Sequence, residues 1–281
     1  MLPSEVRNLI FEYAVCQVVD PSKPVPKRSH KHRLGHEYGS TVRTALLSTC
    51  RRIYYETRMI PLRSTTHHLY EAPKESFNPT DWDHYLFHVS SQSGENLHHL
   101  HVTRWKTPFT FDRHLKPHMH WRKLTWTLCA SEWSAASMHE PFDIANALKE
   151  IVLPHSCWEV NLEYESLKKI PEQRRILREC AKKCRGIQLS RCDGTKIMLD
   201  EEYSMEFTWE GQTWKPADRD DFWQRGHIGD YIDATYHVIR LCWREKVPER
   251  KYMHYDHWDC LRSDGITPIP LDNVSEDEGN E

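Results

Sequence analysis

Apolar and polar positions follow a helical pattern from the start of the chain. In residues 3–15, Val6, Leu9, Ile10 and Tyr13 recur three or four positions apart, while charged and amide side chains fill most positions between them. Proline is tolerated in a first helical turn, because the N–H groups there have no intrahelical acceptor. The pattern therefore predicts an amphipathic helix whose apolar face needs a partner.

The next part of the N-terminal region alternates between irregular and periodic stretches. Residues 16–42 carry prolines, glycines and basic side chains with no apolar period, so we expect a mobile loop there. Residues 41–62 return to helical spacing, and Pro61 limits that helix. Its expected apolar side consists of Leu46, Leu47, Cys50, Ile53, Tyr54 and Thr57. Residues 64–71 then form a predicted short strand.

Short apolar runs in the middle of the chain share the form Leu-x-x-Leu-x-Leu. Residues 97–102 and 148–153 match it well, whereas residues 121–126 and 184–189 match it with Trp or Cys at apolar positions. The runs start 24, 27 and 36 residues apart, and the first two intervals fit the period of leucine-rich repeats. Helical patterns precede three runs, at residues 81–92, 142–148 and 172–183. This predicts an irregular leucine-rich-repeat-like helix/strand stack, with an unrelated α/β or α+β arrangement as the alternative.

The C-terminal part predicts a hairpin and a helix. Apolar side chains alternate along residues 203–214, with a turn expected at Glu210-Gly211. Residues 229–246 place Ile232, Tyr236, Ile239 and Trp243 at helical spacing, which predicts an amphipathic helix that caps the stack. From Asp272 the tail is acidic and poor in apolar residues, so we expect disorder.

These elements define an α/β chain of four segments. We expect an N-terminal helical module with a basic loop (1–70, loop 16–42), a repeat-like α/β body (71–200), a C-terminal hairpin and helix packing on the body (201–271), and an acidic disordered tail (272–281).

Composition narrows the class of protein. The 281 residues are 38% apolar and include 11 Trp, 12 Tyr and 8 Phe, which is ample material for a core. A formal net charge of −3 argues against attraction of the whole protein to nucleic acid or an anionic membrane. We find no apolar run of membrane-spanning length and no secretory signal pattern. We therefore expect an intracellular protein, cytoplasmic or nuclear, whose nine cysteines are mostly buried thiols.

The opening and the second helical stretch together resemble the F-box-like domain of uncharacterised filamentous-fungal proteins, over about a quarter of the chain. The family motif runs Leu-Pro-x-Glu-aliphatic-Arg-Asn-x-Ile, followed by Leu-Leu-x-x-Cys-Arg-x-Ile-Tyr-x-Glu. The matching residues are Leu2, Pro3, Glu5, Val6, Arg7, Asn8 and Ile10, and then Leu46, Leu47, Cys50, Arg51, Ile53, Tyr54 and Glu56.

The resemblance implies a function in protein recruitment. In F-box proteins this module binds the Skp-type adaptor of a cullin ubiquitin ligase, and the rest of the chain, often leucine-rich repeats, holds a protein substrate. It therefore implies a non-enzymatic substrate-recruiting subunit. Its candidate adaptor-binding residues are Leu2, Pro3, Val6, Leu9, Ile10 and Leu47. The alternative is a self-contained α/β scaffold in which Val6, Leu9 and Ile10 pack against residues 44–57; a hydrolase or metal enzyme is a third class.

The body offers a second candidate binding surface. Strand side chains alternate, so the residues between the apolar positions of the four runs should face outward along one surface. These are His99, His101, Lys123, Thr125, Glu150, Val152, Gly186 and Gln188. Their mixed charge favours a protein partner over DNA, which calls for a basic stripe. Trp105, Trp133 and Trp158 follow three of the runs and either anchor a partner at the rim or fill the core.

Motifs for catalysis and metal binding are weak. The chain contains no G-x-S-x-G, P-loop or G-x-G-x-x-G motif, so we expect neither an enzyme nor a cofactor. His114, His118 and His120 would share a helical face only in part, because Pro117 lies between them. His98 and His99 point to opposite faces of a predicted strand and cannot converge on a metal, although His101 can still join a ligand-binding face. The spacing of Cys180, Cys184 and Cys192 is too loose to indicate zinc. Residues 26–33, the basic run, fit a solvated loop better than a nuclear import signal or a nucleic-acid contact.

Overall fold

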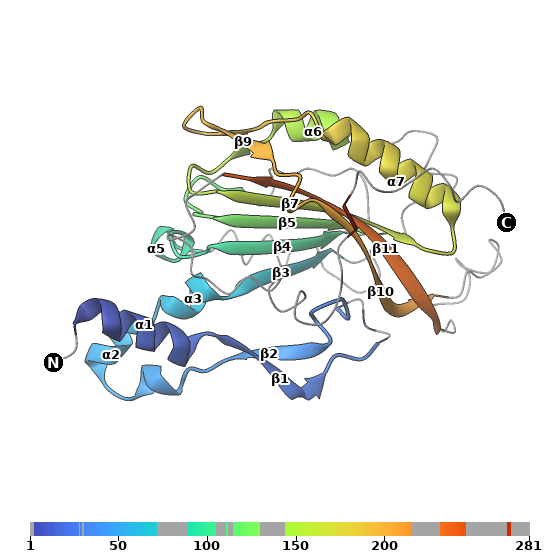
Figure 1. The fold of residues 1–281 in the computed structure, drawn as a ribbon. Coiled ribbons are helices and arrows are strands. Elements are labelled where there is room, and N and C mark those ends of the chain that lie inside the picture. Colours follow the sequence, from blue (N-terminus) through green and yellow to red (C-terminus); the bar gives the residue numbers. More distant parts are fainter. Residues whose placement is uncertain are drawn as a thin grey trace.

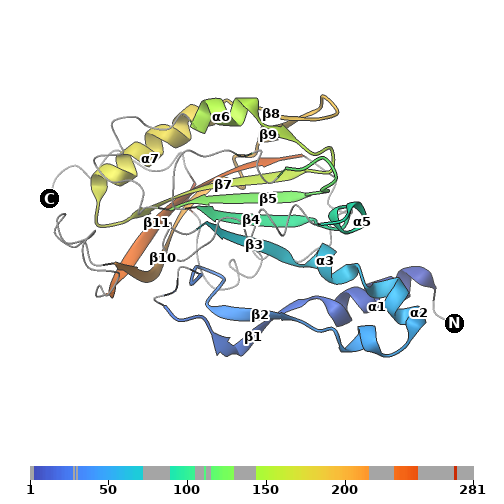
Figure 2. The same ribbon diagram turned by 180° about the vertical axis from the view of Figure 1, so that it is seen from behind.

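The computed structural model describes residues 3–27, 29, 31–71, 89–104, 111, 115–129, 144–214, 231–245 and 269–270. Within these residues the chain forms a ten-stranded mixed sheet, a separate two-stranded ribbon, and helices on either side of the sheet (Figures 1 and 2). The prediction of an architecture that mixes helices and strands is confirmed. No helix among these residues combines the length and the apolar character needed to cross a membrane.

The N-terminal helices build a small core of their own. They are α1 (Ser4–Val15), the 3-10 helix η1 (Ala45–Ser48), α2 (Arg51–Thr57) and α3 (Ile60–Ser64). Phe11, Val15 and Ile60 are buried against Leu46, Leu47 and Ile53. The single helix predicted for residues 41–62 is therefore three short pieces. Pro61 stands in the first turn of α3, where proline fits, and so begins a helix rather than ending one.

The stretch expected to be a mobile loop contains a β-ribbon, so the prediction of a loop is wrong for the residues of its two strands. Strands β1 (Gln17–Pro24) and β2 (Tyr38–Val42) pair antiparallel, with a shift in register between Val19 and Pro24. A two-stranded ribbon exposes many of its side chains, so it needs no apolar period, and its prolines are accommodated where the pairing is irregular. In the connection between the two strands, Arg33, Leu34 and His36 contact the large sheet.

Four neighbouring strands of the large sheet run parallel: β3 (Thr66–Glu71), β4 (His99–Arg104), β5 (Lys123–Leu128) and β7 (Glu159–Leu167). Antiparallel to β7 lies β11 (Tyr231–Arg244). The sheet is completed by β10 (Met205–Trp214), β9 (Lys196–Leu199), β8 (Leu189–Arg191), β6 (Val152–Leu153) and β12 (Ile269–Pro270). The short strand predicted near residue 66 is confirmed. Because β3, β7 and β11 share one sheet, the sheet joins the three segments expected at 1–70, 71–200 and 201–271.

Two helices cover one side of this sheet, opposite the ribbon (Figure 1). They are α6 (Ile144–Glu150) and α7 (Pro171–Cys184), and both were predicted. The short helix α5 (Ser91–Gly94) lies at the end of the pattern at 81–92, most of which is outside the described residues. Leu148 and Leu177 of α6 and α7 pack with Leu124, Leu162 and Trp243 of the strands, and all five side chains are fully buried.

The four aligned runs do not occupy equivalent places. Residues 97–102 and 121–126 lie in register on neighbouring strands, with Leu100 opposite Leu124 and Val102 opposite Trp126. The next parallel strand is β7, whereas residues 148–153 and 184–189 lead to β6 and β8, which pair with each other. The placement of the last two runs beside the first two is therefore wrong. In residues 148–153 the spacing is produced by the end of α6 followed by a two-residue strand.

The predicted C-terminal hairpin turn and helix are also wrong. Strand β10 continues through Gly211, where a Cβ atom would lie 2.4 Å from the Trp209 ring. Residues 229–246 contain the long strand β11, which lies inside the sheet rather than capping it. Both of its faces are largely buried, so its apolar positions do not simply alternate and instead fall by coincidence at helical spacing. The tail at 272–281 lies outside the described residues.

Candidate functional site

The two faces of the parallel strands differ in chemistry because side chains alternate along each strand. One face carries the apolar core under α6 and α7. On the other face the strand register aligns polar residues in rows. One row is His68, His101, Thr125, Asn161 and Cys242, and the next is Tyr70, Thr103, Thr127, Glu163 and Arg240. The expectation that His99, His101, Lys123 and Thr125 share a face agrees with this register.

This polar face is not an open surface, so the expectation that Lys123 and Thr125 face outward is wrong. Thr125 is 9% exposed, Thr127 2% and Glu163 7%. Its charged side chains pair with one another: Lys123 Nζ lies 2.8 Å from Glu159, and the Arg240 guanidinium donates to Glu163. Buried charges are tolerated when they are paired and hydrogen-bonded. The face therefore behaves as an internal polar network.

Glu163 is the centre of that network. It accepts hydrogen bonds from Arg240 and from the Thr127 hydroxyl, whose oxygen lies 2.5 Å from the carboxylate. Burial would raise the pKa of this carboxyl group, but the positive charge of Arg240 and the two hydrogen bonds outweigh it, so the pKa of Glu163 lies below its ordinary value. Glu163 is thus held ionised. Thr127 in turn contacts Nε2 of His101 at 2.8 Å, which extends the network to β4.

The connection between β1 and β2 joins the network through Arg33. This buried guanidinium pairs with Glu165 of β7, contacts Cys129 Sγ at 2.7 Å and lies over the Trp209 ring. Burial opposes the charge of Arg33, but its neighbours Cys129 and Glu165 outweigh burial and raise the pKa of Arg33. Burial raises the pKa of Glu165 as well, against the opposing charge of Arg33. The pair fixes the ribbon connection to the sheet.

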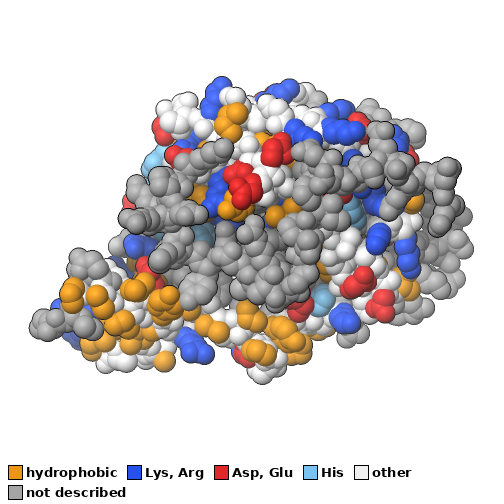
Figure 3. Space-filling model, in the orientation of Figure 1, with side chains coloured by type: hydrophobic (Ala, Val, Ile, Leu, Met, Phe, Trp, Pro, Cys, Tyr) orange, Lys and Arg blue, Asp and Glu red, His pale blue; other side chains and the backbone are white. Residues whose placement is uncertain are grey.

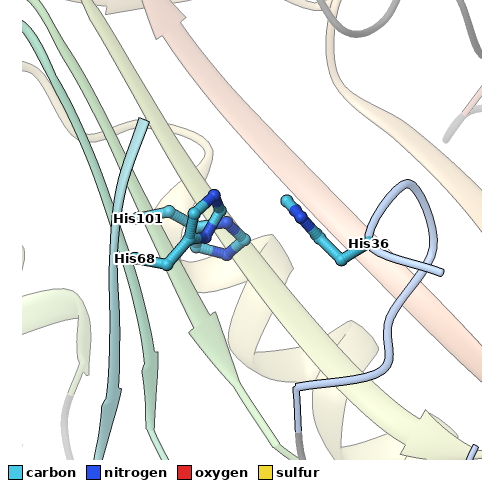
Figure 4. A group of neighbouring side chains, drawn as sticks. All are labelled: His36, His68 and His101. Carbon is cyan, nitrogen blue, oxygen red and sulfur yellow. The ribbon is translucent and has the colours of Figure 1, made fainter. Parts of the chain in front are cut away.

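Three imidazoles meet at the edge of the same face (Figure 4). His68 and His101 are register partners on β3 and β4, and His36 comes from the ribbon connection. The ring centroids of His36 and His68 are 4.3 Å apart, and those of His68 and His101 are 5.0 Å apart. One ring nitrogen of each residue lies within 4.8 Å of the others, and all three residues are half-buried. Within the described residues, this is the group of histidine, cysteine or acidic side chains with metal-binding geometry.

A second candidate surface lies on α1. Val6, Leu9, Ile10 and Tyr13 are 42%, 54%, 48% and 56% exposed, respectively. The stripe that the sequence indicates therefore points to solvent, and the helix is held by Phe11 and Val15 instead. Figure 3 shows hydrophobic side chains gathered over the N-terminal elements. This differs from the scaffold alternative, which expects Val6, Leu9 and Ile10 to be packed.

The other adaptor-site residues of the sequence analysis are distributed differently. Leu2 lies outside the described residues, and Pro3 immediately precedes α1. Leu47 packs partly into the small N-terminal core.

The remaining body residues do not join the polar face. Glu150 ends α6, Val152 lies on β6 with 58% exposure, and Gly186 and Gln188 precede β8. Their predicted place beside His99 and His101 is wrong, because β7, β11 and β9 separate β6 and β8 from β4 and β5.

The tryptophan, cysteine and remaining histidine candidates are scattered. Trp105, Trp133 and His114 lie outside the described residues. Trp158 precedes β7 and is half-buried, with the guanidinium of Arg244 5.5 Å from its ring centre. Cys180 and Cys184 lie on α7, and Cys192 follows β8. The described residues contain no disulfide, and burial raises the pKa of Cys157 to about 12, which keeps that thiol protonated.

Sequence reasoning missed Arg33, His36, His68 and Glu163 as a group. Aligning residues 66–71 with residues 99–104 as parallel neighbours would have placed His68 beside His101. The alternation of polar and apolar residues in 159–165 would have indicated β7 and the side of Glu163. No local pattern indicates that Arg33 and His36 fold back onto the sheet.

Comparisons of the chain with protein-family models, curated proteins and solved structures found no match. The functional argument therefore depends on the geometry of these two surfaces and on the sequence motif.

Proposed function

We propose that this protein is an F-box-like substrate-recruiting subunit whose helix α1 binds the Skp-type adaptor of a cullin ubiquitin ligase. The observation that carries the proposal is the exposure of Val6, Leu9 and Ile10 on a helix whose sequence resembles the F-box-like motif. Such a subunit is not an enzyme, and it acts inside the cell, in the cytoplasm or the nucleus.

The construction of the N-terminal module supports this function. Exposed apolar side chains that adjoin one another are unfavourable in an isolated protein and commonly mark a binding surface. Here the helix is anchored by a different set of residues, Phe11 and Val15, so the exposed stripe is not needed for the small core. The Arg7 and Glu56 side chains, 3.6 Å apart, connect α1 to α2 beside the stripe. A surface with apolar side chains at its centre and charged side chains beside them is typical of protein interfaces.

The body then presents the substrate. Two of the four runs lie in register on neighbouring parallel strands, which is one feature of a leucine-rich-repeat-like stack and supports this role. We propose that a protein substrate contacts the edge of this body near His99, which is half-buried on β4.

Co-purification of the full-length chain with a Skp-type adaptor tests the proposal. Ile10→Asp should abolish binding, because it places a charge at the centre of the stripe. Val19→Asp is the matched control: Val19 is similarly exposed, at 49%, but lies on β1. Each variant should keep the wild-type melting temperature. Absence of binding by the wild-type chain, where a known F-box protein binds, would reject the function, as would equal binding by Ile10→Asp.

A second function, a self-contained binding protein without an adaptor, has one observation in its favour. The N-terminal segment is tied to the body by the Arg33–Glu165 pair and by a hydrogen bond from Arg63 to Asn96. The helices therefore also serve the fold of the whole chain. The adaptor experiment is therefore the one that separates the two functions. Removing residues 1–70 does not separate them, because it deletes most of β3 and should unfold the body in either case.

A further inference from the structure

The three histidines at the edge of the polar face come from distant parts of the sequence. His36 belongs to the connection between β1 and β2, while His68 and His101 stand side by side on β3 and β4 (Figure 4). The third pair of rings, His36 and His101, has a centroid separation of 5.9 Å. Three segments of the chain thus bring imidazole nitrogens to one point.

The distances suit a metal ion after a small adjustment. A zinc ion binds imidazole nitrogen at about 2.0–2.1 Å, so two nitrogens on a tetrahedral ion lie about 3.4 Å apart. In this protein the three nitrogens already lie within 4.8 Å of one another. Rotation of the imidazole rings about their side-chain bonds is the movement that would bring these nitrogens closer together.

The hydrogen bonding of His101 orients it for this role. The Thr127 hydroxyl donates its single proton to the ionised Glu163, so it can only accept from Nε2–H of His101. In the neutral ring, Nδ1 of His101 then carries the lone pair that a metal ion binds. At protein metal sites, a ligating histidine usually donates its other ring N–H to a neighbouring acceptor. Here that acceptor is the Thr127 hydroxyl, which in turn donates to Glu163.

We propose that His36, His68 and His101 bind one divalent transition-metal ion, with zinc as the preferred ion. Three neutral imidazoles select zinc and similar ions over magnesium or calcium, which prefer oxygen ligands. Three protein ligands leave a fourth position for water or an exogenous ligand. Because His36 is on the ribbon connection, the ion also clamps that connection to β3 and β4. Thr127 is a positioning residue that acts through His101.

Zinc titration of the full-length protein, after removal of metals with a chelator, tests the site. Calorimetry with zinc chloride alone should give one ion per chain, and bound zinc should raise the melting temperature, because the ligand binds the folded state. His36→Gln is the most informative ligand variant, since His36 lies in a half-exposed connection outside the regular strands. It should keep the metal-free melting temperature and lose both the binding and the thermal shift.

Two further variants provide the controls. His120 and His155 form a pair of imidazoles with centroids 5.3 Å apart elsewhere in the molecule, so His155→Gln should bind zinc as wild type does. Thr127→Val removes the hydroxyl and should weaken zinc binding by about 10- to 100-fold. Thr127→Ser keeps the hydroxyl and should bind zinc as wild type does. The site is rejected if wild type binds no zinc, if His36→Gln binds as tightly as wild type, or if His155→Gln loses binding to the same extent.

Discussion

The two faces of the large sheet are stabilised in opposite ways. The face under α6 and α7 is filled by apolar side chains such as Leu162 and Trp243, both completely buried. The face toward the ribbon connection is almost as inaccessible, but it is filled by Arg33, Glu163 and other polar side chains that bond one another. Apolar packing is tolerant of small errors in position, whereas buried charges need particular partners. The polar face therefore specifies how the ribbon docks, and the apolar face supplies most of the stability.

The largest effect should come from the apolar face. Trp243→Ala removes a fully buried indole whose N–H donates to the Ile187 carbonyl at 2.7 Å. We expect unfolding free energy to fall by about 4–5 kcal/mol, near the upper end for Trp-to-Ala changes, because a cavity and an unpaired carbonyl result together. Urea unfolding measures this loss. Ile232→Ala, at a position 37% exposed on the same strand, should change stability by less than about 0.5 kcal/mol.

The second effect concerns the polar face and should depend on pairing. Arg240→Met leaves Glu163 as a buried carboxylate with Thr127 alone, and we expect a loss of about 3 kcal/mol. The double variant Glu163→Leu/Arg240→Met removes both charges and should recover most of that loss. A double-mutant cycle by urea unfolding gives the coupling energy. Additive losses would show that the pair is not a unit, and Lys182→Met on the exposed side of α7 serves as the control cation.

The sequence revealed the apolar face better than the polar one. Helical periodicity located α1, α6 and α7, and the Leu-x-x-Leu-x-Leu pattern placed β4 beside β5. Periodicity reports burial against apolar neighbours, so it works where one side of an element is polar and the other apolar. It failed for β11, whose two faces are both buried, and its helical spacing was coincidental.

The polar face depends on contacts between residues far apart in the sequence. Arg33 and Glu165 are separated by 132 positions, and the basic run that contains Arg33 has the composition of a solvated loop. A buried arginine cannot be told from an exposed one by its neighbours in sequence. The three histidines are hidden for the same reason, since His36, His68 and His101 meet only once the strand order and the ribbon are known.

A third prediction concerns the place where polar and apolar packing meet, near β10. Gly211 lies under stacked rings of Trp209 and Tyr236, whose centroids are 4.5 Å apart. In Gly211→Ala the new methyl group would overlap the Trp209 ring, so the stack has to shift. We expect a loss of about 1–2 kcal/mol by urea unfolding, typical of overpacking. Gly186→Ala, at a position where a Cβ atom meets nothing within 4 Å, is the matched control and should be nearly neutral.

The last and smallest effect is a difference in pH dependence between the two faces. The folded-state pKa of Glu163 lies below its ordinary value of 4.5, because Arg240 and Thr127 favour the carboxylate despite burial. The unfolded chain therefore takes up this proton first as the pH falls. The stability contributed by Glu163 is fully present above pH 4.5 and is lost as the pH falls through the folded-state pKa.

Urea unfolding between neutral pH and the acid range, with wild type and Glu163→Gln, measures this contribution. The stability difference between the two proteins should be greatest at neutral pH and should shrink on acidification, because wild type alone loses an ionised Glu163. Trp243→Phe changes only the apolar face, so its difference from wild type should stay constant over the same range. A constant difference for Glu163→Gln as well would mean that Glu163 is not held ionised, and the proton assignment at Thr127 and His101 would then fail with it.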